Sequence, residues 1–392
     1  MRVLYSFPDT VGKPGIGWVA HHQVRHLVAQ GVDVELYCTS VLPGSGIDGL
    51  ASLVTTMEVG GRRIPHRALG VHRAYRRHDA RVARALRSGR ADADLVHTWP
   101  RAVLRTAAAA GERGVPVIRE APNTHTAHAY EVVAAEHRAL GLPLESSETH
   151  AYDRDIVTLE EAEYAAADLL LVPSELAERT FIERGVEPER LALHRYGFDP
   201  DRFTPGQAGH ADTDPLTVLF AARCEPRKAL HHALSAWRRS GLGERGARFI
   251  ICGEFVPGYR EIVATDLEQR GVEFRGFSDD LDSVMREADV FVLPSVEEGS
   301  ALVTYAAQGS GCVPVVSDAA GARCRHMHDG LVHHAGDVDV LAEHLRLLDG
   351  DRDLLRRLRS ASIDTAATLT WENATRDLVR SYERALGSAV PA

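Results

Sequence analysis

The sequence lacks the features on which several classes of protein depend. Only five of its 392 residues are cysteine, and none forms a C-x-x-C pair, so neither a disulfide framework nor a zinc motif is expected. No apolar run reaches the ~18 residues of a membrane-spanning helix. The first residues, MRVLYSFPD, hold too few apolar residues for a signal peptide. We therefore expect reduced thiols in a cytoplasmic protein.

An excess of basic residues is also missing. Lys and Arg number 45 against 55 Asp and Glu, which gives a formal net charge of −10. Because a nucleic-acid protein needs a basic face, we do not expect a nucleic-acid partner. Residues 72–90 are a local exception, with seven arginines and one acid at helical spacing. Such a helix is suited to a weak contact with an anionic membrane, although an exposed Arg-rich helix without a partner is the favoured interpretation.

The sequence does contain a regular alternation of short apolar runs and helical patterns. Between the runs, Ala20, Val24 and Leu27 mark one face of a helix. Strands that alternate with helices predict βαβ units and parallel sheets. The predicted strands are residues 2–7, 33–38, 93–99, 115–120, 167–174, 216–223, 248–253, 272–277, 288–295 and 312–318.

The alternation pauses once, at residues 197–215, where Gly, Pro and Asp crowd together as in a linker. The expected fold class is therefore α/β, with two Rossmann-like, doubly wound parallel-sheet domains facing one another across a cleft. Ligands of such sheets bind beyond the carboxyl ends of the strands, so we expect the site in that cleft.

Two loops at strand ends carry groups suited to phosphate. Gly15 and Gly17 precede a helix, where glycine lets backbone N–H groups approach an anion. The third glycine of a dinucleotide fingerprint is missing, so an ordinary strand–helix turn is an equal alternative. Arg223 ends a strand and Lys228 follows five residues later, a pair able to clamp a diphosphate. Solvated surface cations are the favoured alternative for this pair taken alone.

Polar residues also follow two strands of the first half. His97 ends one predicted strand, and Asn123 and His125 follow the next. Because the carboxyl ends of parallel strands meet at one edge, we expect these side chains to face the cleft. The alternative for each histidine is a hydrogen-bonded structural residue.

Paired carboxylates follow a strand of the second half. Glu297 and Glu298 lie in the turn after residues 288–295, where a carboxylate is able to accept hydrogen bonds from sugar hydroxyls. Gly299, Ser300 and Ala301 then allow close backbone approach and begin a helix. The alternative is a pair of acids that complement the dipole of that helix.

The order of these motifs resembles the retaining, nucleotide-sugar-dependent glycosyltransferases of family four, which have the GT-B fold. The likeness combines the glycine loop, the R-x4-K pattern and the segment EEGSALVTYAAQGSGCVPVV at 297–316, and it is densest over residues 161–345. It implies an acceptor-side domain at residues 1–195 and a nucleotide-sugar-binding domain at residues 196–370. Residues 371–392 would form a helix that crosses back to the first domain.

The resemblance also implies roles for single residues. Gly15 and Gly17 would lie near the donor phosphates, and Arg223 and Lys228 would stabilise the diphosphate as it leaves. Glu298 would face the donor sugar as the first glutamate of an E-x7-E motif.

Further positions carry over in the same way. Leu302 and Val303 would offer backbone groups beside the diphosphate. His125 is the best counterpart of the histidine beside the reacting sugar carbon, and His97 is the next. Since fixed cations would serve the leaving group, no metal and no other cofactor is expected.

The chain departs from the family at Ala306, where the family usually has a second glutamate that holds the ribose hydroxyls. A methyl group accepts no hydrogen bond, and a hydrogen bond to a charged group is worth about 1.5–3 kcal/mol. Three interpretations remain: Glu297 takes over the ribose, the donor carries a deoxyribose, or donor binding is weak and activity is partly or wholly lost.

The sequence thus predicts a metal-independent, retaining glycosyltransferase of the hexosyltransferase type. It would move a sugar from a nucleotide-diphosphate sugar to a hydroxyl of a small molecule, a glycan or a lipid-linked acceptor. The alternatives are a GT-B nucleotide-sugar epimerase and a catalytically silent nucleotide-sugar-binding protein. A Rossmann dehydrogenase is disfavoured because G-x-G-x-x-G is absent.

Overall fold

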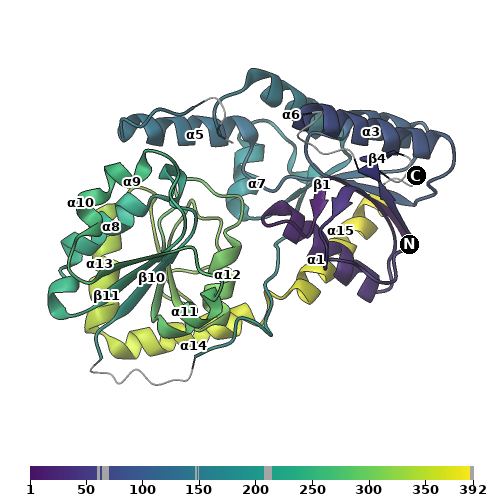
Figure 1. Cartoon of the computed structure of the whole chain (residues 1–392). Helices are drawn as coiled ribbons and strands as arrows, with labels where there is room; N and C mark the ends of the chain where they lie inside the picture. Colours follow the sequence, from purple (N-terminus) through teal and green to yellow (C-terminus); the bar gives the residue numbers. More distant parts are fainter. Residues whose placement is uncertain (60–61, 64–69, 146–147, 149, 207–213, 389–392) are drawn as a thin grey trace.

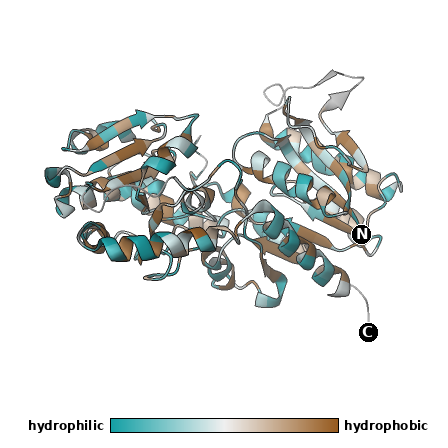
Figure 2. Ribbon diagram, turned by 90° about the horizontal axis from the view of Figure 1, so that it is seen from below, coloured by the Kyte–Doolittle hydropathy of each residue, from teal (hydrophilic) through white to brown (hydrophobic). Residues whose placement is uncertain are grey.

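The protein consists of two parallel β-sheets that lie side by side, each flanked by helices (Figure 1). The computed structural model describes the whole chain except residues 60–61, 64–69, 146–147, 149, 207–213 and 389–392. The strands of both sheets are the apolar runs, which appear as the hydrophobic interior of each half (Figure 2). The predicted α/β fold with two doubly wound domains is confirmed.

The first sheet has seven parallel strands in the order β3-β2-β1-β6-β7-β8-β9. The order reverses between β1 and β6, and such a switch point opens a crevice at the carboxyl ends of the two strands. These strands are β1 (Arg2–Val11), β2 (Asp33–Val41), β3 (Ser52–Thr55), β6 (Leu95–Thr98), β7 (Val117–Glu120), β8 (Leu169–Val172) and β9 (Leu191–Leu193). A small antiparallel pair, β4 (Glu58–Val59) and β5 (Arg62–Arg63), lies apart from this sheet.

Amphipathic helices cover the first sheet. In the first of them Ala20, Val24 and Leu27 are fully buried, which confirms the face predicted from their spacing. The helical segments of this half are α1 (Ile16–Ala29), α3 (Val71–Arg87), α4 (Leu104–Gly111), α5 (Thr126–Ala139), α6 (Arg154–Ala166), α7 (Glu175–Ile182) and the 3-10 turn η1 (Pro188–Arg190).

The second sheet has six parallel strands in the order β12-β11-β10-β13-β14-β15, with its switch point between β10 and β13. Its strands are β10 (Thr217–Ala221), β11 (Arg248–Cys252), β12 (Val272–Gly276), β13 (Val290–Leu293), β14 (Val313–Ser317) and β15 (Leu331–His333). Its helical segments are η2 (Pro226–Lys228), α8 (Leu230–Ser240), η3 (Gly243–Arg245), α9 (Tyr259–Ile262), α10 (Ala264–Leu267), α11 (Leu281–Glu287), α12 (Leu302–Gly309), α13 (Val338–Gly350) and α14 (Arg352–Ala366).

The last helix, α15 (Trp371–Ser388), packs on the first half of the molecule beside α1 (Figure 1). Its Leu378 and Tyr382 are fully buried in the same apolar cluster as Tyr5 of β1. The chain therefore passes between the two halves twice. The two passages touch each other, because the backbone N–H of Phe198 donates to the carbonyl of Leu369 at 3.0 Å. Among the described residues, no helix combines the length and apolar character needed to cross a membrane.

Candidate functional site

A cluster of two cations and two acids lies at the carboxyl ends of β10 and β13. Arg227 and Lys228 come from η2, and Glu297 and Glu298 from the turn after β13. Arg227 Nη1 donates to Glu298 Oε2 at 2.8 Å and to Glu297 Oε2 at 3.2 Å, and Lys228 Nζ is paired with Glu298 Oε1. None of the four side chains is more than 13% exposed. We call these four residues the cation–carboxylate cluster.

Burial and the neighbouring charges shift the pKa values of Glu297 and Lys228. Burial raises the pKa of Glu297, but the Arg227 guanidinium and a hydrogen bond from Thr124 outweigh it, so the pKa lies below the usual value. Burial and the neighbouring Arg227 lower the pKa of Lys228 well below its usual value, although the carboxylates of Glu225 and Glu297 oppose this shift. An anionic ligand that entered here would compete with these carboxylates for the same cations.

The backbone is strained directly after Arg227 and Lys228. Ala229, between η2 and α8, has φ of 51°, a left-handed conformation that non-glycine residues rarely adopt. It is also fully buried, so the surrounding structure holds it there. Such strain gathers at functional sites, and here it lies directly after the two cations of the cluster.

Arg223 lies outside this cluster, on the rim of a separate cavity of about 300 Å³. Its side chain is 61% exposed and lies 3.6 Å from Glu225. Phe277, on the same cavity, is 68% exposed, which is unusual for so large an apolar side chain. The cavity, which we call the second-domain cavity, is lined by Ala221, Ala222, Arg223, Cys252, Gly253, Glu254, Phe277, Ser278 and Leu281.

The segment after Glu298 is pressed against the first domain. A Cβ atom on Gly299 would lie 2.6 Å from Asn123 Cα and closer still to the carbonyl oxygen of Pro122, so only glycine fits. Ser174 Oγ of the first domain donates to the Gly299 carbonyl at 2.6 Å. Thr124 Oγ1 likewise donates to Glu297 Oε1 at 2.6 Å. The two domains are thus in direct polar contact at this turn.

The residues that follow serve this packing. Ser300 Oγ lies 3.0 Å from the hydroxyl of Tyr305, and Ala301 is the residue before α12. Leu302 packs on the apolar cluster of the first domain and Val303 on that of the second. This turn and the start of α12 therefore reach the cores of both domains.

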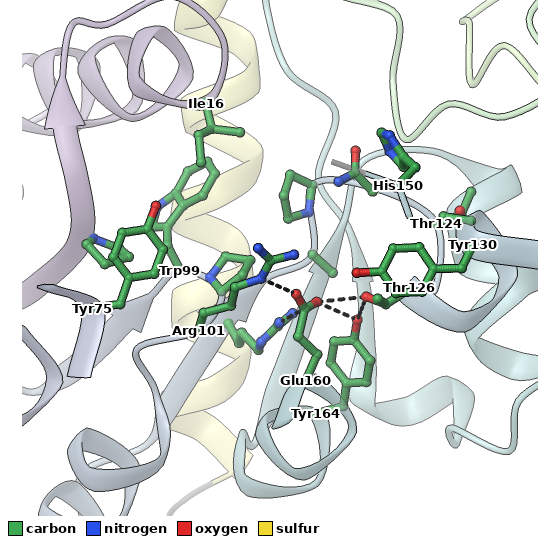
Figure 3. Close-up of a pocket in the computed structure, with 17 residues that line it drawn as sticks. Ile16, Tyr75, Trp99, Arg101, Thr124, Thr126, Tyr130, His150, Glu160 and Tyr164 are labelled. Carbon is green, nitrogen blue, oxygen red and sulfur yellow. Dashed lines mark hydrogen bonds and ion pairs between the residues drawn. The ribbon is translucent and has the colours of Figure 1, made fainter. Parts of the chain in front are cut away.

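A pocket of about 240 Å³ opens at the switch point of the first sheet. Its walls are aromatic, with Tyr75, Trp99, Tyr130 and Tyr164 around it (Figure 3). We call it the first-domain pocket. It is lined by Pro8, Ile16, Tyr75, Trp99, Pro100, Arg101, Arg119, Ala121, Pro122, Asn123, Thr124, Thr126, Ala129, Tyr130, His150, Glu160 and Tyr164.

Polar groups of this pocket converge on Glu160. Arg101 Nε donates to Glu160 Oε1 at 2.8 Å, and Thr126 Oγ1 donates to Oε2 at 2.8 Å (Figure 3). Arg119, fully buried, donates to the same carboxylate at 3.2 Å. Arg101 has φ of 70°, a second strained non-glycine residue next to a cavity. The pocket therefore combines aromatic faces with fixed donors and acceptors, as a sugar-binding site requires.

The predicted glycines and Asn123 lie beside this pocket. Asn123 lines it, and so does Ile16, which stands between Gly15 and Gly17. Gly15 has φ of 85° and starts α1, and a Cβ on Gly17 would overlap the carbonyl oxygen of Thr10. Both glycines are thus required by the backbone at the mouth of the pocket.

The two predicted histidines point elsewhere. His125 is the N-cap of α5: its Nδ1 accepts from the backbone N–H of Ala127 at 3.3 Å, and its ring packs on Phe181. His97 lies within β6, fully buried, with Nδ1 2.6 Å from the hydroxyl of Tyr382. Neither is among the residues that line the two cavities. The geometry of both histidines corresponds to the alternative given above, a hydrogen-bonded structural residue.

His97 belongs to a buried polar network centred on Glu120, at the end of β7. Gln23 donates to Glu120 Oε1 at 2.6 Å and Tyr196 to Oε2 at 3.2 Å. His97 and His194 approach Oε1 at 3.6 and 3.8 Å. Burial raises the pKa of Glu120 to about 8, although Gln23, Tyr196 and Arg119 oppose the shift. Burial lowers the pKa of His194 to about 3, so its imidazole is neutral.

This network predicts a pH dependence of stability. Because the folded-state pKa of Glu120 is raised, its contribution is complete below about pH 4.3 and is lost as pH rises toward 8, at about 1.4 kcal/mol per pH unit. We expect Glu120→Gln, which keeps the neutral form, to raise the melting temperature relative to wild type at pH 8.5 and to leave it nearly unchanged at pH 5. Melting curves across that range test this, and equal pH profiles for the two proteins would contradict it.

The Arg-rich segment 72–90 consists mostly of α3. Arg73 and Arg84 are exposed, whereas Arg81 is partly buried and its Nη1 donates to the carbonyl of Thr56 at 3.0 Å. Tyr75, on the same helix, lines the first-domain pocket. By helical spacing Tyr75 lies on the buried face of α3, opposite the exposed arginines.

Comparisons with known proteins agree with this architecture. Residues 14–197 match the glycosyl transferase 4-like domain, and residues 215–351 match the glycosyl transferases group 1 domain. D-inositol 3-phosphate glycosyltransferases of Mycobacterium tuberculosis and Mycobacterium bovis are 31% identical over 246 residues, which cover 56% of this chain and 49% of theirs. The chain thus spans about half the length of these curated relatives.

Solved structures share the fold over nearly the whole chain. HepE of Anabaena, in complex with UDP and glucose, superposes with a TM-score of 0.67 at 17% identity, covering 98% of this chain and 99% of its own. Sucrose-phosphate synthase from Thermosynechococcus elongatus superposes with a TM-score of 0.69 at 17% identity, covering 99% of both chains. At such identities the likeness establishes a common GT-B fold.

Proposed function

Because the chain belongs to the GT-B glycosyltransferases, we propose that it moves a hexose-type sugar from a nucleotide-diphosphate sugar to a hydroxyl acceptor. The observation that carries this proposal is the position of the cation–carboxylate cluster. It joins the second domain to the first-domain pocket through Thr124, which lines that pocket and donates to Glu297. A donor held by the second domain would therefore present its sugar to an acceptor held by the first.

We assign the donor to the second domain. The base would stack on the exposed ring of Phe277 in the second-domain cavity, and the diphosphate would lie between Arg223 and Lys228. Aromatic rings bind bases through their faces, and cations fixed at the diphosphate stabilise the charge that develops on it. A relative with UDP and glucose bound supports a nucleotide-sugar donor, and its fold is shared over nearly the full length.

Donor binding would rearrange one ion pair. In this structure Lys228 is paired with Glu298 and shielded from solvent. A phosphate oxygen would replace the carboxylate as the partner of Lys228, which frees Glu298 to accept hydrogen bonds from the sugar hydroxyls. Arg227, with 2.8 Å between its Nη1 and Glu298 Oε2, would hold the carboxylate in place during the exchange. No catalytic metal is needed, since the cations already present neutralise the leaving group.

The acceptor would occupy the first-domain pocket. Trp99 and Tyr75 offer apolar faces, and Glu160 with Arg101 offers an acceptor and a donor of hydrogen bonds. Retention of the anomeric configuration is proposed from the sequence resemblance, and a cytoplasmic location from the cysteine usage and the shortage of apolar segments. A weak membrane contact through the exposed arginines of segment 72–90 would suit a lipid-linked acceptor.

The contacts of Glu297 bear on the missing glutamate at position 306. Glu297 is 1% exposed and already holds Arg227 and Thr124, so we assign it to the domain contact rather than to the ribose. Ala306 is 6% exposed within the apolar core of the second domain. We therefore favour a donor whose ribose needs no carboxylate at this position, such as a deoxyribose.

A donor panel tests the proposal. We expect one of the UDP-, GDP-, ADP- and dTDP-sugars to raise the melting temperature by mass action, and that donor to be consumed with an added cell-extract acceptor. Sugar interconversion without an acceptor would indicate the epimerase, and stabilisation without turnover would indicate the silent binder.

Arg223→Ala and Phe277→Ala should each weaken stabilisation by the same nucleotide, and unchanged stabilisation in both would overturn the assignment of the second-domain cavity.

A further inference from the structure

Two histidines and one glutamate that do not belong to the cation–carboxylate cluster meet where the two domains face each other. His231 and His232 lie in the first turn of α8, and Glu136 lies near the end of α5. Although α5 follows β7 of the first sheet, it runs across to the second domain (Figure 1). Leu140 and Leu142, just beyond it, pack on the core of the second domain. The three side chains therefore bridge the domains.

The spacing of the three side chains fits a metal ion. Glu136 Oε1 lies 2.7 Å from His231 Nε2 and 3.6 Å from His232 Nε2, and the three ligand atoms lie within 4.8 Å of one another. Ligands about 2.1 Å from a tetrahedral zinc ion are roughly 3.4 Å apart. The two observed separations bracket this value, so small rotations of the side chains would complete the geometry.

The atoms around the cluster are arranged as around a metal ligand. The hydroxyl of Tyr259 lies 2.6 Å from His231 Nδ1, the position from which a second group orients a metal-binding imidazole. Glu136 Oε1 is enclosed, and the two imidazole nitrogens at 2.7 and 3.6 Å are its neighbours in the cluster. A cation between these three atoms would interact with all of them at once.

The chemistry of the three side chains also suits a metal. Two imidazoles and one carboxylate are a donor set of zinc sites with one position left for water.

We propose that Glu136, His231 and His232 form a zinc site that fastens α5 of the first domain to α8 of the second. The ion would take no part in sugar transfer. Its effect on the enzyme would be mechanical, since His231 follows Lys228 by only two intervening residues and α5 contacts η2. Fastening α5 to α8 would hold η2, and with it the cations of the proposed donor site, at a fixed distance from the first domain.

Zinc titration of chelator-treated protein tests this without any donor or acceptor. We expect one zinc ion per chain by calorimetry, a higher melting temperature with zinc, and slower amide hydrogen exchange in the second half of α5 and the first turn of α8. Glu136→Gln and His232→Ala should each weaken zinc binding by at least about tenfold, since each removes a ligand. Glu136→Gln keeps the size of the side chain, and its melting temperature without zinc reports whether it folds.

A double variant in other histidines provides the matched control. His328 and His334 each lie beside an aspartate and are exposed, and His328→Ala with His334→Ala should leave zinc binding unchanged. Absence of zinc binding by wild type would overturn the proposal, as would equal binding by Glu136→Gln. Zinc bound without slower exchange in α5 would overturn the fastening role. Because no readout involves turnover, these outcomes are independent of the proposed sugar transfer.

Discussion

Lys228→Ala and Glu298→Ala should each lower turnover by at least about tenfold. Lys228 Nζ and Glu298 Oε1 are paired in a place shielded from solvent, where electrostatic interactions are strong. Removing the lysine would take away a cation that stabilises the leaving diphosphate. Removing the glutamate would take away the hydrogen-bond acceptor assigned to the donor sugar. Initial rates at saturating and at low donor concentration separate the effect on kcat from that on KM.

The control is a pair of the same kind on the surface. Arg270 and Glu244 are 3.2 Å apart and about 70% exposed, so Arg270→Ala and Glu244→Ala should leave the rate unchanged. Glu298→Gln should fold as wild type does, because it keeps the shape of the side chain beside Arg227. Wild-type rates in both Lys228→Ala and Glu298→Ala would exclude the cation–carboxylate cluster from the reaction.

Gly299→Ala should lower kcat/KM by at least about tenfold, equivalent to about 1.4 kcal/mol in the barrier. Its new methyl group would overlap the Pro122 carbonyl and lie 2.6 Å from Asn123 Cα, so the two domains would have to separate at this contact. The hydrogen bonds from Ser174 to the Gly299 carbonyl and from Thr124 to Glu297 would lengthen or break. Small-angle scattering should show a more extended molecule.

Gly350→Ala is the matched control for this substitution. Gly350 ends α13, and a Cβ there would meet no atom within 4 Å. Its melting temperature, scattering profile and kcat/KM should equal those of wild type within error. If Gly299→Ala behaved in the same way as Gly350→Ala, the close approach of the two domains would be irrelevant to activity.

The central buried strands could be predicted from the sequence because each is a continuous apolar run of strand length between two helical patterns. Every predicted run coincides with a strand: β1 and β2 extend beyond their predicted ends, to Val11 and Val41, and the other strands are shorter than predicted by up to two residues at an end. The predictions missed β3, β9 and β15, which have three or four residues and lie at or near sheet edges. In so short a strand, the partner strand rather than the local sequence fixes the conformation.

Arg227 is the residue of the cation–carboxylate cluster that the sequence did not indicate. The pattern R-x4-K drew attention to Arg223 and Lys228, but η2 turns Arg227 inward and leaves Arg223 at the surface. Arg227 is held inward by Glu297 and Glu298, about 70 residues along the chain, and residue spacing within the loop does not indicate such partners. The proline and the cations of this loop can be read from the sequence, whereas the direction of each side chain cannot.

The histidines show the same limit. A position at the carboxyl end of a parallel strand predicts proximity to the cleft, and His97 and His125 do lie at or after the ends of β6 and β7. Side-chain direction was decided by other partners: the first turn of α5 for His125, and Tyr382, far along the chain, for His97. The proposed zinc site of Glu136, His231 and His232 could not be predicted from the sequence for a related reason. Its residues come together only because α5 packs on the second domain.

The two passages of the chain between the domains have a mechanical consequence. Phe198 is bridged to Thr370, and Gly197 lies so close to Trp371 that a Cβ there would be 2.5 Å from its Cα. Two chain passages that contact each other at one place form a hinge between the domains. We expect this hinge to favour rotation of one domain about that place over sliding or twisting, so that the cleft opens along one path. A protease cut in one passage would leave the domains joined by the other and would remove this restriction on their relative motion.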